Sequence, residues 1–424
     1  MKLWLHIAAR NLWRNKRRTL LAVGALALGV GIMIDVLAFL NTMKGVQTVQ
    51  VVYGQLVALQ VHRKGYVANI LSNPLELDFE DTSELRQKVQ SIKGVKAMTP
   101  RILFNGMISV PPDLANDPNA EEQTSFLNIT AIDPLAEKNV CPTIYDWIIE
   151  GRMLANDQAR ELIINAEVGK SIKTHVVPEG DPVPDESQWP VIITSDRDGA
   201  MNGEALLPVG HLGSALPGDR RIAYVPIQVV QRLLRMEGRV TEYAISLNSL
   251  DDLEQVQQEL QKTLGPDFEV HRWDELLPFI KNIQKTATYF FNIVTSIFMV
   301  IVLLGILNTM LMNVMERIRE IGTMMAVGVR RSKLVLLFVM EGITMGTVGG
   351  LCGIALGLVG MLLINAAHFH IPAPASNVWF LIQLGVSGQQ ILQSMLLTVV
   401  GSAVASLWPA IHASKLLPVE ALRG

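Results

Sequence analysis

The chain has 424 residues, of which 50% are hydrophobic and 18% carry a charged side chain. Ordinary soluble domains contain about 25% charged residues, so this composition argues against a wholly soluble protein. The net charge of −3 excludes no class of protein by itself. The placement of the charges is more informative, because it separates apolar stretches from a long mixed segment.

The N-terminal segment, residues 1–18, carries basic side chains and no acidic side chain. Leu5, Leu12 and Trp13 fall on one face of a helix, whereas the arginines lie largely off that face. Basic amphipathic helices of this kind lie in the plane of a membrane surface. We therefore predict a cytoplasmic amphipathic helix that anchors the start of the chain.

Four apolar stretches are long enough to cross a membrane, which takes about 20 residues in a helix. They predict transmembrane helices at residues 19–40, 286–313, 334–364 and 389–411. The first stretch continues too far for a cleaved signal peptide and has no small-residue cleavage site after it. The predicted fold class is an α-helical membrane protein with four transmembrane helices and a large α+β extracytoplasmic domain between the first and second.

Lys and Arg are unevenly distributed around these stretches. Several basic residues lie in the loop 314–333, whereas the third and fourth spans and the loop between them contain none. The positive-inside rule then predicts that both termini, the loop 314–333 and the tail 412–424 are cytoplasmic. Residues 41–285 and the short loop 365–388 are predicted to lie outside the cytoplasm.

Helix and strand patterns alternate within residues 41–285. Residues 55–62 have strand character, and residues 83–92 are typical of a helix. A capping pattern at Ser249 precedes apolar residues at helical spacing, which predicts an amphipathic helix that ends at Gly265. The proline-rich stretch 177–190 is interpreted as a loop or subdomain boundary.

The chain shows no convincing motif for catalysis of its own. Residues 169–171 read Gly-Lys-Ser, but a phosphate loop needs a glycine where this chain has Ile164. His368 and His370 flank one residue of a loop, and a solvated turn explains them better than a metal site. We therefore predict no catalytic residue, no cofactor and no metal, and no nucleic-acid partner.

The third apolar stretch contains two series of glycines at four-residue spacing. One series is Gly342, Gly346 and Gly350, and the other is Gly349, Gly353 and Gly357. Small residues at this spacing let helix backbones approach closely in lipid. The pattern fits fixed packing and a helix that slides against its neighbour equally well.

Two acidic residues lie within the predicted spans. A carboxylate at mid-bilayer costs at least about 2.5 kcal/mol, so each of them requires a reason. Asp35 is near the outer end of its span and is predicted to reach the lipid headgroups. Glu341 is near the cytoplasmic end of the third span, where we predict that it pairs with an arginine of the preceding loop.

The loop between the second and third spans begins with a charged helix. An apolar patch follows, and Gly328 precedes the basic entry to the third span; the patch consists of Ile321, Met324, Met325 and Val327. An exposed apolar patch in a short cytoplasmic loop predicts docking of a protein partner. The alternative is a helix that lies on the lipid headgroups.

This loop closely resembles the MERxREIGxxxAxG signature of the FtsX-like permease family, which includes MacB-type exporters and the lipoprotein-releasing LolC and LolE permeases. The matching residues are Met315, Glu316, Arg317, Arg319, Glu320, Ile321, Gly322, Ala326 and Gly328. Residues 10–20 and 409–423 are similar to the family's first and last conserved segments, and residues 150–154 are similar to a turn of its outer domain.

The resemblance implies a non-catalytic ABC transporter permease in the inner (plasma) membrane, with a periplasmic domain of two subdomains. It implies two copies of a separate ATPase subunit, a second permease copy or paralogue, and contact with membrane lipid. The long second span, residues 286–313, would transmit ATP-driven movement to the periplasmic domain. The implied ATPase-coupling residues are Glu316, Arg317, Arg319, Glu320, Ile321, Gly322, Met324, Met325 and Gly328.

The nature of the cargo is indicated more weakly. Residues 55–66 are similar to a stretch that follows the first span in LolC and LolE permeases. This similarity favours release of lipoproteins or other lipidated cargo, with a periplasmic chaperone as a further partner. MacB-like efflux of drugs or peptides with a membrane-fusion protein, and FtsX-like regulation of a cell-wall hydrolase, are the alternatives.

Overall fold

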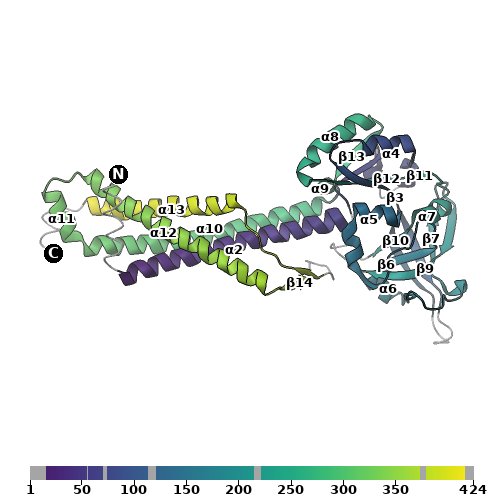
Figure 1. Cartoon of the computed structure of the whole chain (residues 1–424), viewed down its shortest axis with the longest axis horizontal. Coiled ribbons are helices and arrows are strands. Elements are labelled where there is room, and N and C mark those ends of the chain that lie inside the picture. Colours follow the sequence, from purple (N-terminus) through teal and green to yellow (C-terminus); the bar gives the residue numbers. More distant parts are fainter. Residues whose placement is uncertain are drawn as a thin grey trace. The chain divides into compact units, whose positions relative to one another are not determined.

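The computed structural model describes residues 16–54, 56–69, 74–112, 121–213, 221–372 and 379–415, and these fold into two compact units (Figure 1). The helical unit comprises Met1–Lys44, Asn282–His370 and Leu381–Gly424, and the α/β unit comprises Gly45–Lys281 and Ile371–Phe380. The predicted N-terminal amphipathic helix and most of the C-terminal tail lie outside the described residues.

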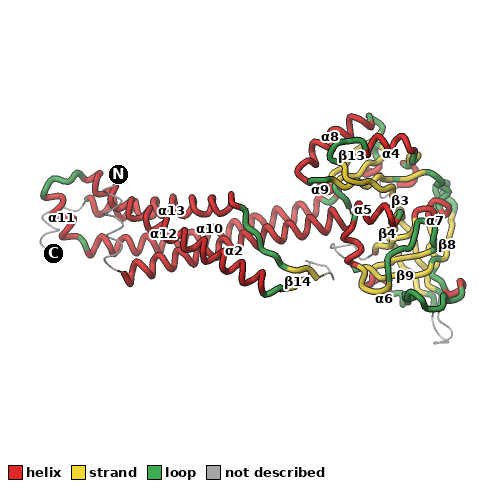
Figure 2. Tube along the Cα trace, viewed as in Figure 1, coloured by secondary structure: helices red, strands yellow, loops and turns green. Residues whose placement is uncertain are grey.

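The helical unit is built mainly from four long helices (Figure 2). They are α2 (Lys16–Gly54), α10 (Pro278–Glu316), α12 (Arg331–Ala366) and α13 (Gly388–Ser414), and the short α11 (Ile318–Ala326) joins α10 to α12. All four long helices are long and apolar enough to cross a membrane, which confirms the predicted four-span architecture. Leu26, Ile34, Ile306 and Met345 contribute to the apolar core between them.

The first two long helices extend well beyond the predicted spans. The helix α2 continues to Gly54, past the predicted end at residue 40, and α10 begins at Pro278, before the predicted start at residue 286. The long apolar stretches end near the predicted limits, but the helical backbone continues through the mixed polar and apolar residues beyond them. Both helices are therefore shared between the helical unit and the α/β unit.

The described residues of the α/β unit form an eleven-stranded sheet with the order β13-β1-β12-β3-β4-β10-β6-β9-β5, and β7 joins β3 to β8. The strands are β1 (Leu59–Arg63), β3 (Val95–Val110), β4 (Gln123–Ile132), β5 (Ile148–Gly151), β6 (Glu161–Asn165), β7 (Val191–Ser195), β8 (Met201–Ala205), β9 (Leu207–Leu212), β10 (Ile222–Pro226), β12 (Glu242–Leu247) and β13 (Phe268–Arg272). Two short pairs accompany it, β2 (Phe79–Glu80) with β11 (Arg239–Val240) and β14 (His370–Pro372) with β15 (Trp379–Leu381).

Helices cover both faces of this sheet. They are α3 (Tyr66–Asn69), α4 (Ser83–Gln90), α5 (Pro134–Val140), α6 (Ala166–Ser171), α7 (Ile227–Leu233), α8 (Leu253–Leu264) and α9 (Trp273–Leu276). Leu162 and Ile164 of β6 belong to a large apolar cluster with α4, α7 and α8, whereas Ile163 belongs to a smaller one with α5. Because neighbouring strand residues point to opposite faces, the two clusters lie on opposite sides of the sheet. The predicted division into two subdomains stays a prediction.

The helix ends follow from local chemistry. The Thr82 hydroxyl accepts a hydrogen bond from the Leu85 N–H at 3.2 Å and caps α4, which lies within the predicted helix at residues 83–92. The predicted helix that ends at Gly265 is also present as α8, and Gly265 adopts a φ of +82°. Ser249 caps a short 3₁₀ turn instead of α8 itself, because its hydroxyl accepts from the nearer Asp251 N–H.

Candidate coupling site between the second and third spans

The connection between α10 and α12 is a sharp elbow followed by a short helix. The helix α10 ends at Glu316, and Arg317 (φ −110°, ψ 16°) leaves the helical conformation before α11 begins. The backbone stays bonded across the elbow, since the Arg317 N–H donates to the Val314 carbonyl at 3.1 Å. After α11, Gly328 adopts a φ of +96°, a conformation that favours glycine and lets the chain turn into α12.

One face of α11 is buried within the chain's own helices. Ile321 is 1% exposed and belongs to an apolar cluster with Val314, Leu334, Phe338, Ala410 and Ala413. Gly322 is also buried, and Met324 and Met325 are half-buried against the same cluster. The expectation of an exposed patch at Ile321, Met324 and Met325 is therefore wrong for Ile321 and holds only in part for the two methionines. Local sequence could not show that α12 and α13 cover this face.

The opposite face of α11 is exposed and mixes charge with apolar surface. We define the α11 outer face as Arg319, Glu320, Thr323, Ala326 and Val327, all of which are exposed. Their spacing of three and four residues places them on one side of a helix. Val327 is 87% exposed, so a large apolar side chain stands at the end of this face. Val327 belongs to the apolar patch that was expected to be exposed, and this part of the prediction is confirmed. Thr323 was not singled out from the sequence, although it lies at helical spacing from Arg319 and Glu320.

A buried ion pair joins the elbow to the third span. Nη1 of Arg317 lies 3.1 Å from Oε1 of Glu341 in α12, and the two side chains are 15% and 2% exposed. This contact confirms the prediction that Glu341 pairs with an arginine of the preceding loop. The pairing also gives the carboxylate in α12 the compensating charge that an apolar environment demands.

The two glycine series of α12 face two different helices. A Cβ atom built on Gly342 would lie 2.5 Å from Oγ of Ser406 in α13, and one on Gly346 would overlap Ser402. On the other series, a Cβ atom on Gly353 would lie 2.9 Å from the Ala27 carbonyl of α2. Gly350 faces Met395 and Thr398 of α13, and Gly349 and Gly357 face Leu26, Gly31 and Ile34 of α2. The serines of α13 were not singled out from sequence, although Ser394, Thr398, Ser402 and Ser406 recur at the same four-residue spacing.

The Asp35 carboxylate is directed toward α12. A Cβ atom on Gly360 would lie 2.8 Å from Oδ2 of Asp35. The Oδ1 atom is buried and has no hydrogen-bond partner among the residues that the structure describes. The side chain thus packs against a neighbouring helix, and its reach to the headgroups stays a prediction. Glycine at position 360 leaves the space that this close approach requires.

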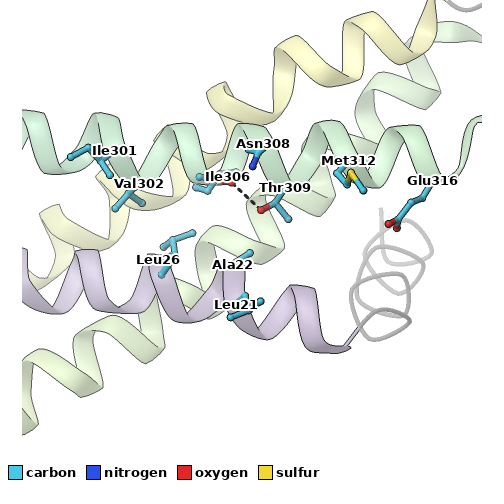
Figure 3. Close-up of a pocket in the computed structure, with 12 residues that line it drawn as sticks. Leu21, Ala22, Leu26, Ile301, Val302, Ile306, Asn308, Thr309, Met312 and Glu316 are labelled. Carbon is cyan, nitrogen blue, oxygen red and sulfur yellow. Dashed lines mark hydrogen bonds between the residues drawn. The ribbon is translucent and has the colours of Figure 1, made fainter.

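The helix α10 is the least buried of the four long helices. Figure 3 shows a groove between α10 and α2, with Leu21 and Leu26 on one side and Ile301, Asn308 and Met312 on the other. The groove has a volume of about 590 Å³. Asn292, Ser296 and Asn308 are exposed on α10, so its apolar surface is interrupted by polar side chains.

The α/β unit buries a second arginine among acidic side chains. Arg101 of β3 is 4% exposed and lies beside Glu137 of α5 and Glu242 of β12, both of which are fully buried. Nη1 of Arg101 is 3.3 Å from Oε1 of Glu242, and Nε is 3.2 Å from Oε2 of Glu137. Burial raises the pKa of Glu242 to about 7, against the opposing effect of Arg101. Nothing in the sequence pattern pointed to this cluster.

In the stretch that resembles LolC and LolE permeases, residues 57–62 lie in the core of the α/β unit, whereas Arg63 and Lys64 are exposed. His62 and Tyr66 are buried, and their rings stack with centroids 4.5 Å apart. Nε2 of His62 is 3.1 Å from Oε1 of Gln60, and Nδ1 is 3.2 Å from the Thr241 carbonyl. Gln60 and His62 both lie on β1, and the contact of His62 with Thr241 links β1 to the segment that leads into β12.

Comparison with known protein families gives two matches. Residues 19–263 match the MacB-like periplasmic core domain, and residues 292–418 match the FtsX-like permease C-terminal family. The first match alone covers more than half of the chain.

Several curated proteins are similar to this chain. The macrolide export ATP-binding/permease protein MacB of Bdellovibrio bacteriovorus is 25% identical over 441 residues, which cover 99% of this chain and 61% of that protein. An uncharacterized ABC transporter permease of Methanocaldococcus jannaschii is 27% identical over 203 residues, which cover 47% of this chain and 49% of that protein. The chain thus spans about half to three fifths of the length of these relatives.

Another similar protein is the uncharacterized ABC transporter permease YknZ of Bacillus subtilis, which is 26% identical over 232 residues, or 53% of this chain and 55% of that protein. Among solved structures, the periplasmic region of MacB from Actinobacillus actinomycetemcomitans aligns with a TM-score of 0.33 and 13% identity, covering 53% of this chain and 92% of that one.

Proposed function

Since this chain belongs to the MacB-like periplasmic core domain family and is an ABC transporter permease with an FtsX-like C-terminal region, we propose that a separate ATPase subunit drives it. In this proposal the chain hydrolyses no ATP itself. ATP-driven movement enters at α11, passes into the long helices and changes the conformation of the α/β unit. The membrane is the inner (plasma) membrane, with the α/β unit on its periplasmic side.

The observation that carries this proposal is the two-sided character of α11. Its inner face is fixed to α12 and α13 through Ile321, whereas its outer face leaves Arg319, Thr323 and Val327 in solvent. A helix held on one side and exposed on the other can receive a partner without unfolding. The charged rim and the exposed Val327 side chain suit a protein groove that excludes water from the centre of the contact.

The orientation of the helices in the membrane is part of the proposal. Arg317, Arg319, Arg330, Arg331 and Lys333 all lie in or beside the α10–α12 connection. The positive-inside rule favours this connection, and with it both termini, on the cytoplasmic side, where ATP is available. Labelling from outside should therefore modify a cysteine placed at Val183 in the α/β unit and leave one at Ser332 unmodified. The opposite result would contradict this orientation.

Docking is tested by Val327→Glu, made in the full chain and co-expressed with the ATPase subunit that co-purifies with the unmodified chain. A charge at this position must lose its hydration when a partner covers it, and we expect co-purification to fall by an amount that corresponds to a few kcal/mol. Met324→Glu is a poorer test, because Met324 also contacts the chain's own apolar cluster.

The matched control is Val183→Glu, which places the same charge at an exposed valine of the α/β unit. It should leave co-purification unchanged. If Val327→Glu retains as much ATPase as Val183→Glu, the α11 outer face is not the docking surface. The headgroup-lying arrangement of α11 would then be the better explanation.

A second permease copy is the further partner that we propose. Polar side chains such as Asn292 and Asn308 are costly when they face lipid, and interhelical hydrogen bonds to a second copy or paralogue would satisfy them. The groove between α2 and α10 would receive apolar side chains of that copy. Disulfide crosslinking through a cysteine at Ile297, which is 55% exposed, should trap a dimer, whereas a cysteine at Leu363 of α12 should not.

For the cargo we propose lipoproteins or other lipidated molecules, which the permease would extract from the inner membrane for a periplasmic chaperone. Export of a small molecule or peptide with a membrane-fusion protein is the second candidate. It is supported by the relatives named for macrolide export and by a pyoverdine export ATP-binding/permease protein, PvdT, of Pseudomonas syringae that is 27% identical over 252 residues. Release of a radiolabelled lipoprotein from spheroplasts that depends on this chain would favour the first proposal, and its absence would favour the second.

A further inference from the structure

The elbow between α10 and α11 is held by a side chain as well as by its backbone. Arg317 is the residue between the two helices, and its carbonyl accepts the Ile321 N–H of α11 at 2.9 Å. Its guanidinium reaches Glu341, which lies 24 positions later in the chain. A single residue therefore connects the end of α10, the first turn of α11 and the body of α12.

The pair lies in an apolar environment, which favours a single relative position of its two side chains. The Glu341 side chain is 2% exposed, and the neighbouring Phe338 and Met345 of α12 are buried as well. Separating a buried ion pair gives up the attraction that offsets the desolvation of its two charges, so intermediate positions are disfavoured. Apolar contacts can slide by small steps, but a buried ion pair is either made or broken.

Apolar packing alone would attach α11 to its neighbours. Ile321 already contributes to the cluster that contains Leu334, Phe338 and Ala413. Well-packed apolar residues often stabilise a protein as much as a buried ion pair does, so stability by itself does not account for the pair. What the pair adds is a defined angle between α11 and α12.

The position of Glu341 in α12 extends the connection further. The next residue, Gly342, lies against Ser406 of α13, and Gly346 one turn later lies against Ser402. A displacement of the elbow that is passed to Glu341 thus reaches the part of α12 that packs most closely on α13. Close packing leaves little room for α12 to absorb the displacement internally.

We propose that Arg317 is a positioning residue that locks α11 to α12 through Glu341, so that a push on the α11 outer face moves α12 as one body with the elbow. Passing this push from α11 to α12 is the transmission role of Arg317, and it rests on the proposed function, because it requires an ATPase on that face. The positioning role does not depend on any partner.

The positioning role is tested in the full chain in lipid nanodiscs, with spin labels attached at the exposed positions Val327 and Leu363 by chemistry that does not use thiols. The unmodified chain should give a narrow distribution of distances between the labels. Arg317→Gln and Glu341→Gln should each broaden it. The control is Arg331→Gln, which removes an exposed arginine at the start of α12 and should leave the distribution narrow.

The double variant Arg317→Glu with Glu341→Arg restores the pair with reversed charges and should return the narrow distribution. It also covers the case in which a single variant fails to fold. If Arg317→Gln stays as narrow as Arg331→Gln, or if the folded double variant stays broad, the pair does not position α11 and the proposal is wrong.

The transmission role is tested with the ATPase subunit that co-purifies with the unmodified chain. Arg317→Gln should retain binding of this subunit, because Thr323 and Val327 are untouched. Its stimulation of ATP hydrolysis should fall at least about fivefold, the lower range of measured coupling between sites. Loss of binding together with stimulation would make Arg317 a docking residue and overturn the proposal. If Val327→Glu keeps the ATPase bound, the docking proposal fails while the distance measurements still stand.

Discussion

Each of the two units buries an arginine, and the two sites differ in how charge is arranged around it. In the helical unit, Arg317 pairs with Glu341 across an elbow at 3.1 Å. In the α/β unit, Arg101 is shared between Glu137 and Glu242, and burial raises the pKa of Glu242 to about 7. The first arrangement orients one helix on another, whereas the second leaves a carboxyl group close to its point of ionisation at neutral pH.

The largest effect is expected from Arg101→Leu. Removing the guanidinium leaves Glu137 and Glu242 buried side by side without a compensating charge, which typically costs about 3–5 kcal/mol. Chemical unfolding of the full chain in detergent should show this loss. The control is Arg235→Leu, because Arg235 is 60% exposed, and exposed ion pairs contribute about 0–1 kcal/mol. An equal effect of the two substitutions would show that Arg101 does not compensate the buried charges of Glu137 and Glu242.

The effect of Glu242→Gln on the stability of the folded chain is expected to depend on pH. The pKa of Glu242 in the folded chain, about 7, is above the ordinary value of 4.5, so the folded state holds this proton more tightly. The free energy of unfolding therefore falls as pH rises from about 4.5 to about 7, and it stays at the lower value above that range. The Gln variant lacks this ionisation, so at pH 8 it should be more stable than the unmodified chain by at most about 3 kcal/mol.

Below about pH 4.5 the difference between the Gln variant and the unmodified chain should vanish. Unfolding titrations at pH 4.5, 6 and 8 measure it, with the exposed Glu80→Gln as the control that should show no such trend. A difference that is the same at all three pH values would show that Glu242 does not ionise in this range.

Glu341→Gln should have a smaller effect than Arg101→Leu. The amide still accepts a hydrogen bond from Arg317 but loses the charge, and hydrogen bonds to charged groups contribute about 1.5–3 kcal/mol. Thermal unfolding in nanodiscs measures the loss, with Gln390→Glu as a control for altered charge in the first turn of α13. A cost as large as that of Arg101→Leu would show that the two buried arginine sites contribute equally to stability.

The smallest effects concern the packing of α12. Gly353→Ala places a methyl group against the backbone carbonyl of Ala27 and should cost about 1–3 kcal/mol, as overpacking does. Gly350→Ala meets the flexible end of Met395 and should cost less. Gly305→Ala in α10, which has open space around it, should be neutral or slightly stabilising. The reverse order would show that α12 does not pack on α2 as described.

Much of the helical unit could be predicted because transfer into lipid depends on composition. The four spans follow from runs of apolar residues, and the arginine partner of Glu341 follows from the cost of an isolated carboxylate in that environment. Helix ends such as Gly265 were also predictable, since capping depends on residues within a few positions of one another.

The rotation of each helix about its axis is decided by contacts between segments far apart in the chain. Ile321 was expected to be exposed, but α12 and α13 cover it, and the Asp35 carboxylate lies against Gly360 of α12. The partners of the two glycine series are likewise set by how α12 sits between α2 and α13. The spacing of small residues fixes a face of a helix and leaves open which neighbour that face meets.

The sequence by itself determined the membrane class, the number of spans, the family and the presence of a helix between the second and third spans, because each depends on local composition or on a contiguous motif. Only the tertiary structure decided which face of α11 is available to a partner and that Arg101, Glu137 and Glu242 share one buried site. Those three residues come from strands and a helix separated by 36 and 141 positions. No local sequence pattern predicts that these residues lie together, because their proximity arises from the pairing of β3 with β12 and the packing of α5 on the sheet.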